Sequence, residues 1–506
     1  MVFEPNFKKV VSSTRRSIGI SQVVVDVKLP TQETNIENVF SVGARATVLS
    51  HEIVGNGINF NGLVDMQIVY AGDAGTACLD YSAEFKDVYN VGRELTGELI
   101  LNAGIVDVSS QVNSNGVNIV VIVEISIDEI VSSDINVLVN VAGEKVYQST
   151  KSLSLSTYIG KAYEKFDVSH DVTIAGAKSI LMVTPCARIE RVDPKENYLV
   201  LQGVLNLDIC YKNGDKVEAI SSDNHSVDFT WEVALNGINS DSIIESAISI
   251  IYNEIKVSTN IDDSGAVISV FVPMSYSGYV FAKEQLEVVD DVYIEDYYLS
   301  ITAENFDSIS QGKGIAFSDG ISGVATIQES SPFIDNLIGV TCTNLVLARS
   351  VIEDDVLYVE GVATTNVLYY TKETSEMTSV QVEMPFVIEE KVSMDNASVV
   401  TICLSKVSAR SKRGKEIEVS AELNVYADLY TDESVAVISD ITLGAVKPCD
   451  DCSLHIYIVK PDQTLWDIAK EIGVSQDLIL EQNSDVELPV KAGDRLVVYR
   501  PQIMKF

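Results

Sequence analysis

The sequence has few basic residues, few histidines and no long apolar run. Its 36 Lys and Arg residues stand against 73 Asp and Glu residues, which gives a formal net charge of −37 and a pI near 4.3. A field of this sign repels phosphate backbones and anionic lipid headgroups, so nucleic acid is not expected as a partner. No stretch approaches the ~18 apolar residues that a membrane-spanning helix needs, so no membrane insertion is expected.

An export signal is also lacking. The first thirty residues contain charges and prolines where a secretory signal needs an unbroken apolar stretch of about 7–15 residues. Arg15-Arg16 resembles a twin-arginine pattern, but Asp26 and Lys28 interrupt the apolar run behind it. The expected location is therefore the cytoplasm.

Catalytic motifs are absent as well. The four histidines are dispersed, and the sequence contains no G-x-S-x-G elbow, no Walker A motif and no G-x-G-x-x-G loop. Acidic pairs such as Asp290-Asp291 lack the ordered ligand spacing of a calcium loop, and we expect them to be solvated turn residues. The sequence thus predicts a non-enzymatic protein with no catalytic residue, no metal site and no cofactor.

The seven cysteines form no disulfide framework. Five are scattered singly in strand-like segments, where a free thiol behaves as a small buried hydrophobe: Cys78, Cys186, Cys210, Cys342 and Cys403. Unpaired thiols are expected, as in a reducing compartment. Cys449 and Cys452, with His455 close behind, have the spacing of half a zinc site. They are read as part of a solvated linker, with a redox pair or a metal site as the alternatives.

What the sequence does contain is a threefold repeat of strands. Three segments carry a Gly eight residues before a Tyr: Gly62 and Tyr70, Gly203 and Tyr211, Gly361 and Tyr369. Because side chains alternate across a strand, each segment places one row of apolar residues on a single face. The predicted buried rows are Ile58, Phe60, Val64, Met66 and Ile68; Leu199, Leu201, Leu205, Leu207 and Ile209; and Leu357, Val359, Ala363, Thr365 and Val367.

Hairpin signals recur at the same period. After each of these strands comes a Phe (Phe85, Phe229 or Phe386) and then a glycine between two alternating runs, at Gly116, Gly265 and Gly414, 149 residues apart. The class predicted is mainly β, with three tandem antiparallel sandwiches that each leave one sheet face solvated. The predicted domains are residues 1–160, 161–300 and 301–445, then a linker at 446–453 and a module at 454–506.

The C-terminal module has a different pattern. His455 to Val459 alternates like a strand, and Thr464 stands at an N-cap position before a helical spacing of apolar residues that ends at Gly473. A second helix is predicted from Ser475 to Asn483, followed by a strand from Arg495 to Tyr499. This segment resembles a LysM module, a βααβ fold whose relatives mostly bind chitin or peptidoglycan. It differs at Asp462-Gln463, where most relatives carry Gly-Asp.

Three β repeats followed by a LysM module resemble the SipL-like family of clostridial spore-coat morphogenetic proteins, whose repeats are called SPOCS or DUF3794. The resemblance implies a mother-cell protein at the forespore surface. It also implies that the LysM module docks to stage IV sporulation protein A, the self-assembling ATPase beneath the coat. Other coat proteins are possible partners of the repeats.

The resemblance also places the binding groove. It lies between the loop before the first helix and the loop before the last strand, here Asp462, Gln463, Thr464, Leu465 and Trp466 facing Leu488, Pro489 and Val490. Trp466 is either a core aromatic or part of the docking face. Lys470 is expected on the opposite helix face. The apolar residues beside Pro489 favour a protein partner, so peptidoglycan is not expected; the alternative is an exported glycan-binding wall protein.

Overall fold

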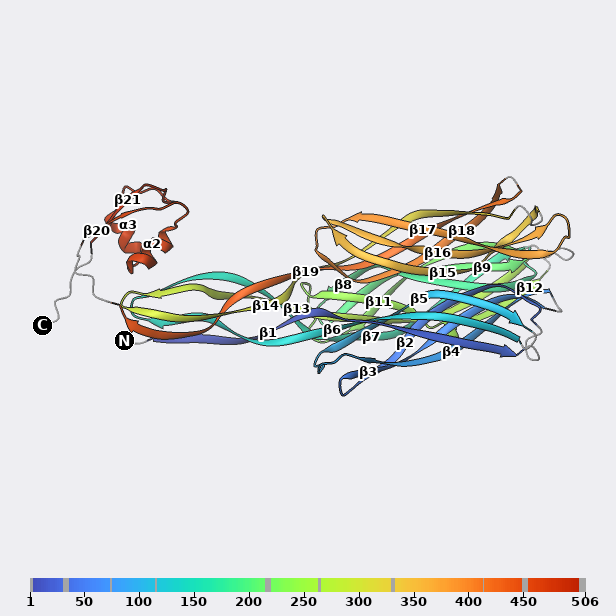
Figure 1. The fold of residues 1–506 in the computed structure, drawn as a ribbon, viewed down its shortest axis with the longest axis horizontal. Coiled ribbons are helices and arrows are strands. Elements are labelled where there is room, and N and C mark those ends of the chain that lie inside the picture. Colours follow the sequence, from blue (N-terminus) through green and yellow to red (C-terminus); the bar gives the residue numbers. More distant parts are fainter. Residues whose placement is uncertain are drawn as a thin grey trace.

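The computed structural model describes residues 3–30, 36–72, 75–113, 116–213, 220–262, 265–328, 333–412, 414–447 and 454–499. The chain folds into three antiparallel β-sandwich repeats and a small βααβ module, which confirms the predicted fold class (Figure 1). The predicted Cys449–Cys452 linker lies outside the described residues. Among those described, no helix is long and apolar enough to cross a membrane.

The first repeat sets the pattern for the other two. It consists of β1 (Phe3–Pro30), β2 (Asn38–Val54), β3 (Gly57–Gly72), β4 (Gly75–Asn90), β5 (Glu98–Asn113) and β6 (Gly116–Gly143). One sheet is the meander β2-β3-β4, and the other has the order β1-β6-β5, so the first and last strands pair. The buried faces of the two sheets meet in one apolar core.

The second and third repeats follow the same order. The second contains β7 (Val146–Ala175), β8 (Ser179–Lys195), β9 (Tyr198–Lys212), β10 (Ile220–Ala234), β11 (Ile243–Ile250), the 3-10 turn η1 (Tyr252–Glu254), β12 (Lys256–Asp262) and β13 (Gly265–Ile294). The third contains β14 (Tyr297–Thr326), β15 (Ile334–Glu353), β16 (Val356–Thr371), β17 (Met377–Lys391), β18 (Asn396–Lys412) and β19 (Glu416–Val446). In each, the first long strand again pairs with the last, and each repeat has a core of its own.

The three glycine-centred strands are β3, β9 and β16, the middle strands of their meanders. Their predicted apolar rows are confirmed as buried, with side chains between 0 and 3 % exposed. The glycines pair across the ladder with the three phenylalanines: Gly62 with Phe85, Gly203 with Phe229, and Gly361 with Phe386. An added Cβ would lie 2.3, 2.4 and 2.6 Å from the respective ring carbon Cζ. Each glycine is therefore the site over which an aromatic ring lies.

The hairpins predicted before Gly116, Gly265 and Gly414 are present, since β5–β6, β12–β13 and β18–β19 are paired ladders. Two predicted domain boundaries lie within strands. The boundary between residues 160 and 161 lies inside β7, and that between residues 300 and 301 lies inside β14. Strand pairing changes partner instead at the turns 143–146 and 294–297. Continuous apolar alternation through the long strands concealed these turns.

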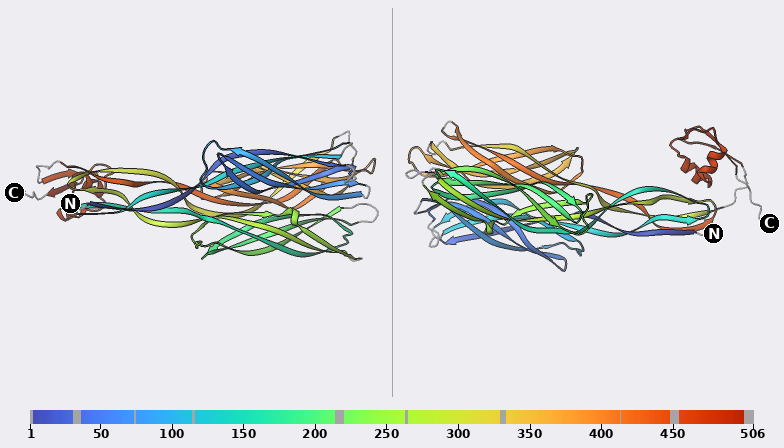
Figure 2. Two further views of the ribbon diagram at one scale, coloured as in Figure 1. Left: turned by 90° about the horizontal axis from the view of Figure 1, so that it is seen from below. Right: turned by 180° about the vertical axis from the view of Figure 1, so that it is seen from behind.

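The three repeats pack around a common axis. An apolar cluster at their junction takes side chains from all three, namely Phe40 and Val69, Met182, Cys210 and Ile220, and Ile338, Cys342 and Leu368. The long pairs β1–β6, β7–β13 and β14–β19 run past the sandwiches as a shared stalk, and the N-terminus lies at its end (Figures 1 and 2). Two further clusters of the three repeats fill the stalk.

This packing corrects the prediction of one solvated face per sheet. On β19 the alternate residues from Ile417 to Leu429 face the core, but Asn424, Tyr426 and Asp428 on the opposite face are each only 2 % exposed. They contact the neighbouring repeat, where Arg188 Nη1 donates to Asn424 Oδ1 at 2.5 Å. The polar residues that alternate along β19 therefore line an interface.

Buried charges join the repeats where the sandwiches meet the stalk. Arg15 donates from Nη1 to Glu245 Oε2 at 2.6 Å and from Nη2 to Asp128 Oδ2 at 2.5 Å, and its side chain is 5 % exposed. Asp428, from the third repeat, accepts hydrogen bonds from Ser246 N and from Tyr426 Oη. Burial, with Glu245 nearby, raises the pKa of Asp428 well above its usual value near 3.8.

Replacing Asp428 with asparagine should change how stability depends on pH. Because the folded protein binds the Asp428 proton more tightly than the unfolded chain does, its stabilising contribution is complete below about pH 3.8 and is lost as pH rises toward the folded-state pKa. The neutral amide does not undergo this loss. The unfolding free energy of Asp428→Asn minus that of the parent should therefore grow with pH, by at most about 1.4 kcal/mol per unit.

Urea unfolding of both proteins between pH 4 and 8 measures this difference. Asp440→Asn, an exposed change on the same strand, is the matched control. A difference that stays constant over this range would contradict protonation of Asp428 in the fold.

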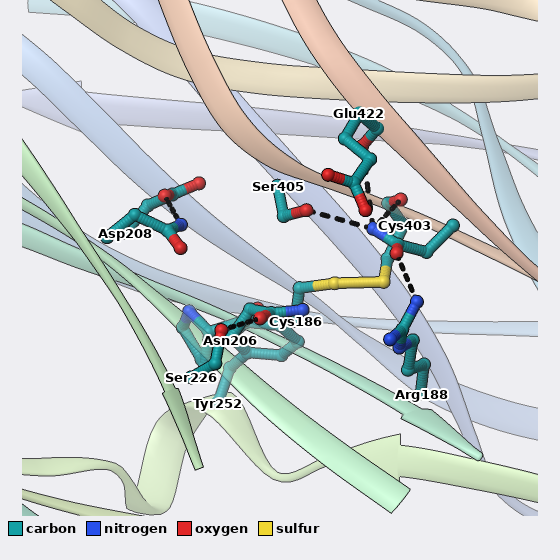
Figure 3. Close-up of a disulfide and its surroundings, with 12 residues drawn as sticks. Cys186, Arg188, Asn206, Asp208, Ser226, Tyr252, Cys403, Ser405 and Glu422 are labelled. Atoms are coloured by element: carbon teal, nitrogen blue, oxygen red, sulfur yellow. Dashed lines mark hydrogen bonds between the residues drawn. A yellow bond between two sulfur atoms is a disulfide. The ribbon is translucent and has the colours of Figure 1, made fainter. Parts of the chain in front are cut away.

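One disulfide corrects the expectation of unpaired thiols. Cys186 on β8 is bonded to Cys403 on β18, with their Cα atoms 6.0 Å apart, so the second and third repeats are covalently linked (Figure 3). The two cysteines are 217 residues apart, and no local spacing indicates the pairing. Cys78, Cys210 and Cys342 are free. Burial raises the pKa of each of these three thiols, which keeps them unreactive.

Candidate functional site

The C-terminal module forms as its sequence predicts. It consists of β20 (Leu454–Ile458), α2 (Leu465–Ile472), α3 (Gln476–Gln482) and β21 (Arg495–Tyr499). Thr464 Oγ1 accepts from Asp467 N at 3.2 Å, while Thr464 N donates to Asp467 Oδ2 at 2.9 Å, which is a complete capping box. Gly473 ends α2 with a φ of 73°, and Ser475 caps α3.

A small apolar core holds the two helices against the sheet. Ile468, Ala469, Ile479, Leu496 and Val498 are fully buried. Leu465 is 9 % exposed, so this predicted groove residue contributes to the core rather than to an open surface.

The loop before α2 shows why Asp462-Gln463 can replace the usual Gly-Asp. Asp462 has a φ of 59°, a conformation that Asp tolerates better than most residues. Gln463 is engaged within the module, because its Oε1 accepts from Lys460 N at 3.0 Å and its Nε2 lies 3.1 Å from Glu471 Oε2. Its amide is thus not available to a ligand in this conformation.

The facing loop carries the other predicted groove residues. Leu488 is 59 % exposed and Pro489 is exposed, whereas Val490 is half-buried against the core of the module. Asp462 and Thr464 are also exposed. The exposed part of the predicted site is therefore Asp462, Thr464, Leu488 and Pro489.

Trp466 has a third role that neither sequence reading described. Its Nε1 donates to Asp291 Oδ2 of β13 at 2.8 Å, and its ring lies edge-on to Tyr293, with 5.0 Å between centroids. Lys470 Nζ binds both carboxylate oxygens of Asp291 at 2.7 Å. The module is therefore attached to the end of the stalk through α2. Lys470, expected on the helix face opposite the groove, is part of this contact.

The contact continues at the end of α2. Tyr293 is 4 % exposed, and its hydroxyl donates to Val474 O at 2.7 Å. Tyr147 lies opposite Tyr293 on β7, with the two ring centroids 5.1 Å apart and the rings tilted by 32°, and its hydroxyl donates to Glu295 Oε1. Burial and the Glu295 carboxylate raise the pKa of Tyr147 to about 12. We define Tyr147, Asp291, Tyr293, Trp466 and Lys470 as the stalk seat.

Sequence reasoning missed the stalk half of this seat. Asp291 was expected to be a solvated turn residue, yet it lies in β13 and accepts bonds from two side chains of α2. Nothing in the local pattern around Asp291 or Tyr293 indicates a contact with residues 175 and 181 positions away.

His225 Nε2 lies 3.4 Å from Asp223 Oδ2. His170 and His225 come closest, with ring centroids 6.4 Å apart, and burial lowers the pKa of His51. Within the described residues, no group of three or more His, Cys, Asp or Glu side chains could hold a metal ion.

Comparison with known proteins identifies the module. Residues 457–498 match the model of the LysM domain family. No curated protein and no solved structure matches the chain. The chain thus carries a LysM domain, and this domain class points to binding of carbohydrate or of protein.

Proposed function

We propose that this protein is a non-enzymatic scaffold of spore-coat assembly, acting in the mother-cell cytoplasm at the forespore surface. Its LysM module would dock to stage IV sporulation protein A, and its repeats are available to other coat proteins. The proposal rests on the order of domains, three SPOCS-like β repeats followed by LysM. The observation that carries it is the placement of the LysM module at the end of a long stalk, away from the three sandwiches (Figure 1).

The chemistry of the groove favours a protein over a sugar. Leu488, Pro489 and Val490 are apolar, and the amide of Gln463 is already engaged by Lys460 N and Glu471. A sugar site usually presents free hydrogen-bonding groups, whereas an apolar loop suits a protein surface.

Binding of the purified chain to stage IV sporulation protein A tests the proposal. The full chain should bind, and a chain ending at Lys447 should not. Val490→Arg places a charge in the groove and should weaken binding at least about thirtyfold, the effect of losing an interface hot spot worth ~2 kcal/mol.

Glu481→Gln, an exposed change on α3, is the matched control, because Lys470 belongs to the stalk seat. Circular dichroism should show that Val490→Arg keeps its helices. If the truncated chain still binds, the β repeats are the docking element. If the truncated chain fails to bind but Val490→Arg binds like the parent, the groove assignment is wrong while the module remains the docking element.

The alternative function is that of an exported protein that binds peptidoglycan or chitin through the same module. The Cys186–Cys403 disulfide favours it, because disulfides persist mainly in oxidising compartments. Sedimentation of the purified chain with peptidoglycan or chitin separates the two functions, and the scaffold proposal expects no co-sedimentation.

A further inference from the structure

The stalk seat engages one side of the groove that is predicted to bind the partner. Trp466 belongs to this groove, and its indole has a single donor, Nε1, which donates to Asp291 Oδ2 at 2.8 Å. The same carboxylate binds Nζ of Lys470, one turn further along α2. The indole ring itself lies against Tyr293. While the module is seated, neither the donor nor this part of the ring of Trp466 is open to another protein.

The loops of the groove remain open in the same structure. Asp462 and Thr464 before α2, and Leu488 and Pro489 in the facing loop, are all exposed. Figure 1 shows α2 on the side of the module toward the stalk. The stalk thus covers the groove at α2 and leaves its loops accessible. A partner that uses the whole groove must compete with the stalk for Trp466.

The contact between module and stalk has the character of a reversible one. Its polar part is accessible to solvent, since the side chain of Asp291 is 28 % exposed and that of Lys470 is 44 % exposed. An accessible ion pair contributes little to stability. The apolar part depends on the ring of Tyr293, whereas the module has fully buried residues of its own on both helices and on β21. Small contacts of this kind between domains of one chain typically permit relative motion.

The chain keeps a released module close to its seat. Lys447, which follows β19, donates from its N to Asp296 O at 2.9 Å and from its Nζ to Ile294 O at 2.7 Å, so it is held beside the strand that carries the seat. The module begins a few residues later, at Leu454. Because seat and module belong to one chain, the seat competes with any partner at a high effective concentration.

From these contacts we propose that the stalk seat is an autoinhibitory contact. While Asp291 holds Trp466 and Lys470, the groove is closed at α2, and stage IV sporulation protein A binds fully only to a module that has left the stalk. This inference rests on the proposed function, because it concerns the regulation of the same groove. The apparent affinity of the chain is then the affinity of the free module multiplied by the fraction of modules released from the seat.

Replacing Asp291 with alanine in the full chain should release the module. The change removes both the acceptor of Trp466 Nε1 and the ionic partner of Lys470. Purified stage IV sporulation protein A should then bind about tenfold more tightly than it binds the parent, the factor that corresponds to one charge-assisted hydrogen bond. Asp291→Asn, whose amide oxygen can still accept from Trp466, should give a smaller increase.

A neighbouring carboxylate provides the matched control, and fluorescence reports release without the partner. Asp290 binds Lys151 Nζ at 2.8 Å instead of the module, so Asp290→Ala should bind like the parent. The chain has two tryptophans, and in a Trp231→Phe background quenching by acrylamide reports on Trp466 alone. Asp291→Ala should increase this quenching, and Asp290→Ala should leave it unchanged.

The outcomes separate this inference from the function on which it depends. An increase in both quenching and affinity with Asp291→Ala, but not with Asp290→Ala, supports autoinhibition. If quenching stays unchanged, Asp291 does not hold the module and the inference is wrong. If quenching increases while the affinity does not, the seat only mounts the module, which also overturns the inference, yet the scaffold function stands because the parent binds. If neither the parent nor Asp291→Ala binds, both proposals fail.

Discussion

Replacing Arg15 with alanine should destabilise the protein by about 3–5 kcal/mol, the cost of removing one partner from a buried ion pair. Arg15 is the cation between Asp128 of its own repeat and Glu245 of the second repeat, and the side chain of Glu245 is only 2 % exposed. Without the guanidinium, two carboxylates would remain close together in a poorly solvated site. Arg15→Ala should therefore weaken the packing of the first repeat against the second and lower the free energy of unfolding.

The midpoint of urea unfolding measures this effect at constant pH. Arg191→Ala is the matched control, because Arg191 also binds a carboxylate, that of Asp193 at 2.6 Å, but its side chain is 68 % exposed. An exposed pair of this kind contributes about 0–1 kcal/mol. If Arg15→Ala and Arg191→Ala lower the free energy of unfolding equally, burial of the ion pair does not explain the contribution of Arg15.

The second large effect is expected at the glycine of β9. A Cβ on Gly203 would lie 2.4 Å from Arg188 O and 2.4 Å from Phe229 Cζ, and the carbonyl is part of the ladder and cannot move away cheaply. Gly203→Ala should therefore destabilise the second repeat by about 1–3 kcal/mol through overpacking, and Gly203→Leu by more.

A glycine in a roomier strand provides the control. Gly104 lies in β5, and a Cβ there would meet no atom within 4 Å. Gly104→Ala should leave the thermal midpoint unchanged or raise it slightly, because alanine restricts the unfolded chain. An unchanged midpoint for Gly203→Ala would mean that the ring of Phe229 can be displaced at little cost.

Local pattern was sufficient to predict much of this structure. The alternation of β19, the glycine at the centre of β9 and the cap at Thr464 each depend on neighbours within a few residues or on the paired strand. For this reason the strands, the hairpins and the βααβ order of the C-terminal module followed from periodicity and turn chemistry.

The contacts between repeats could not be predicted in this way. A polar residue at every second position indicates a solvated face, and only the third dimension shows that Tyr426 and Asp428 face another repeat. The same holds for the Cys186–Cys403 disulfide and for Asp291 beneath Trp466, where neither partner differs locally from an ordinary surface or core residue.

The stalk seat also determines how many LysM modules the end of one stalk can hold. In a trimer of identical chains, three equal stalk ends would hold three copies of the module, with threefold valency toward the partner. Here the three repeats belong to one chain. At the repeat period of 149 residues, the positions equivalent to Tyr293 in the first and third repeats are Glu144 and Thr442, neither of which has a phenol ring. Among the described residues, only the second repeat places a tyrosine ring against Trp466, so this stalk offers one seat for a LysM module where a symmetric trimer would offer three.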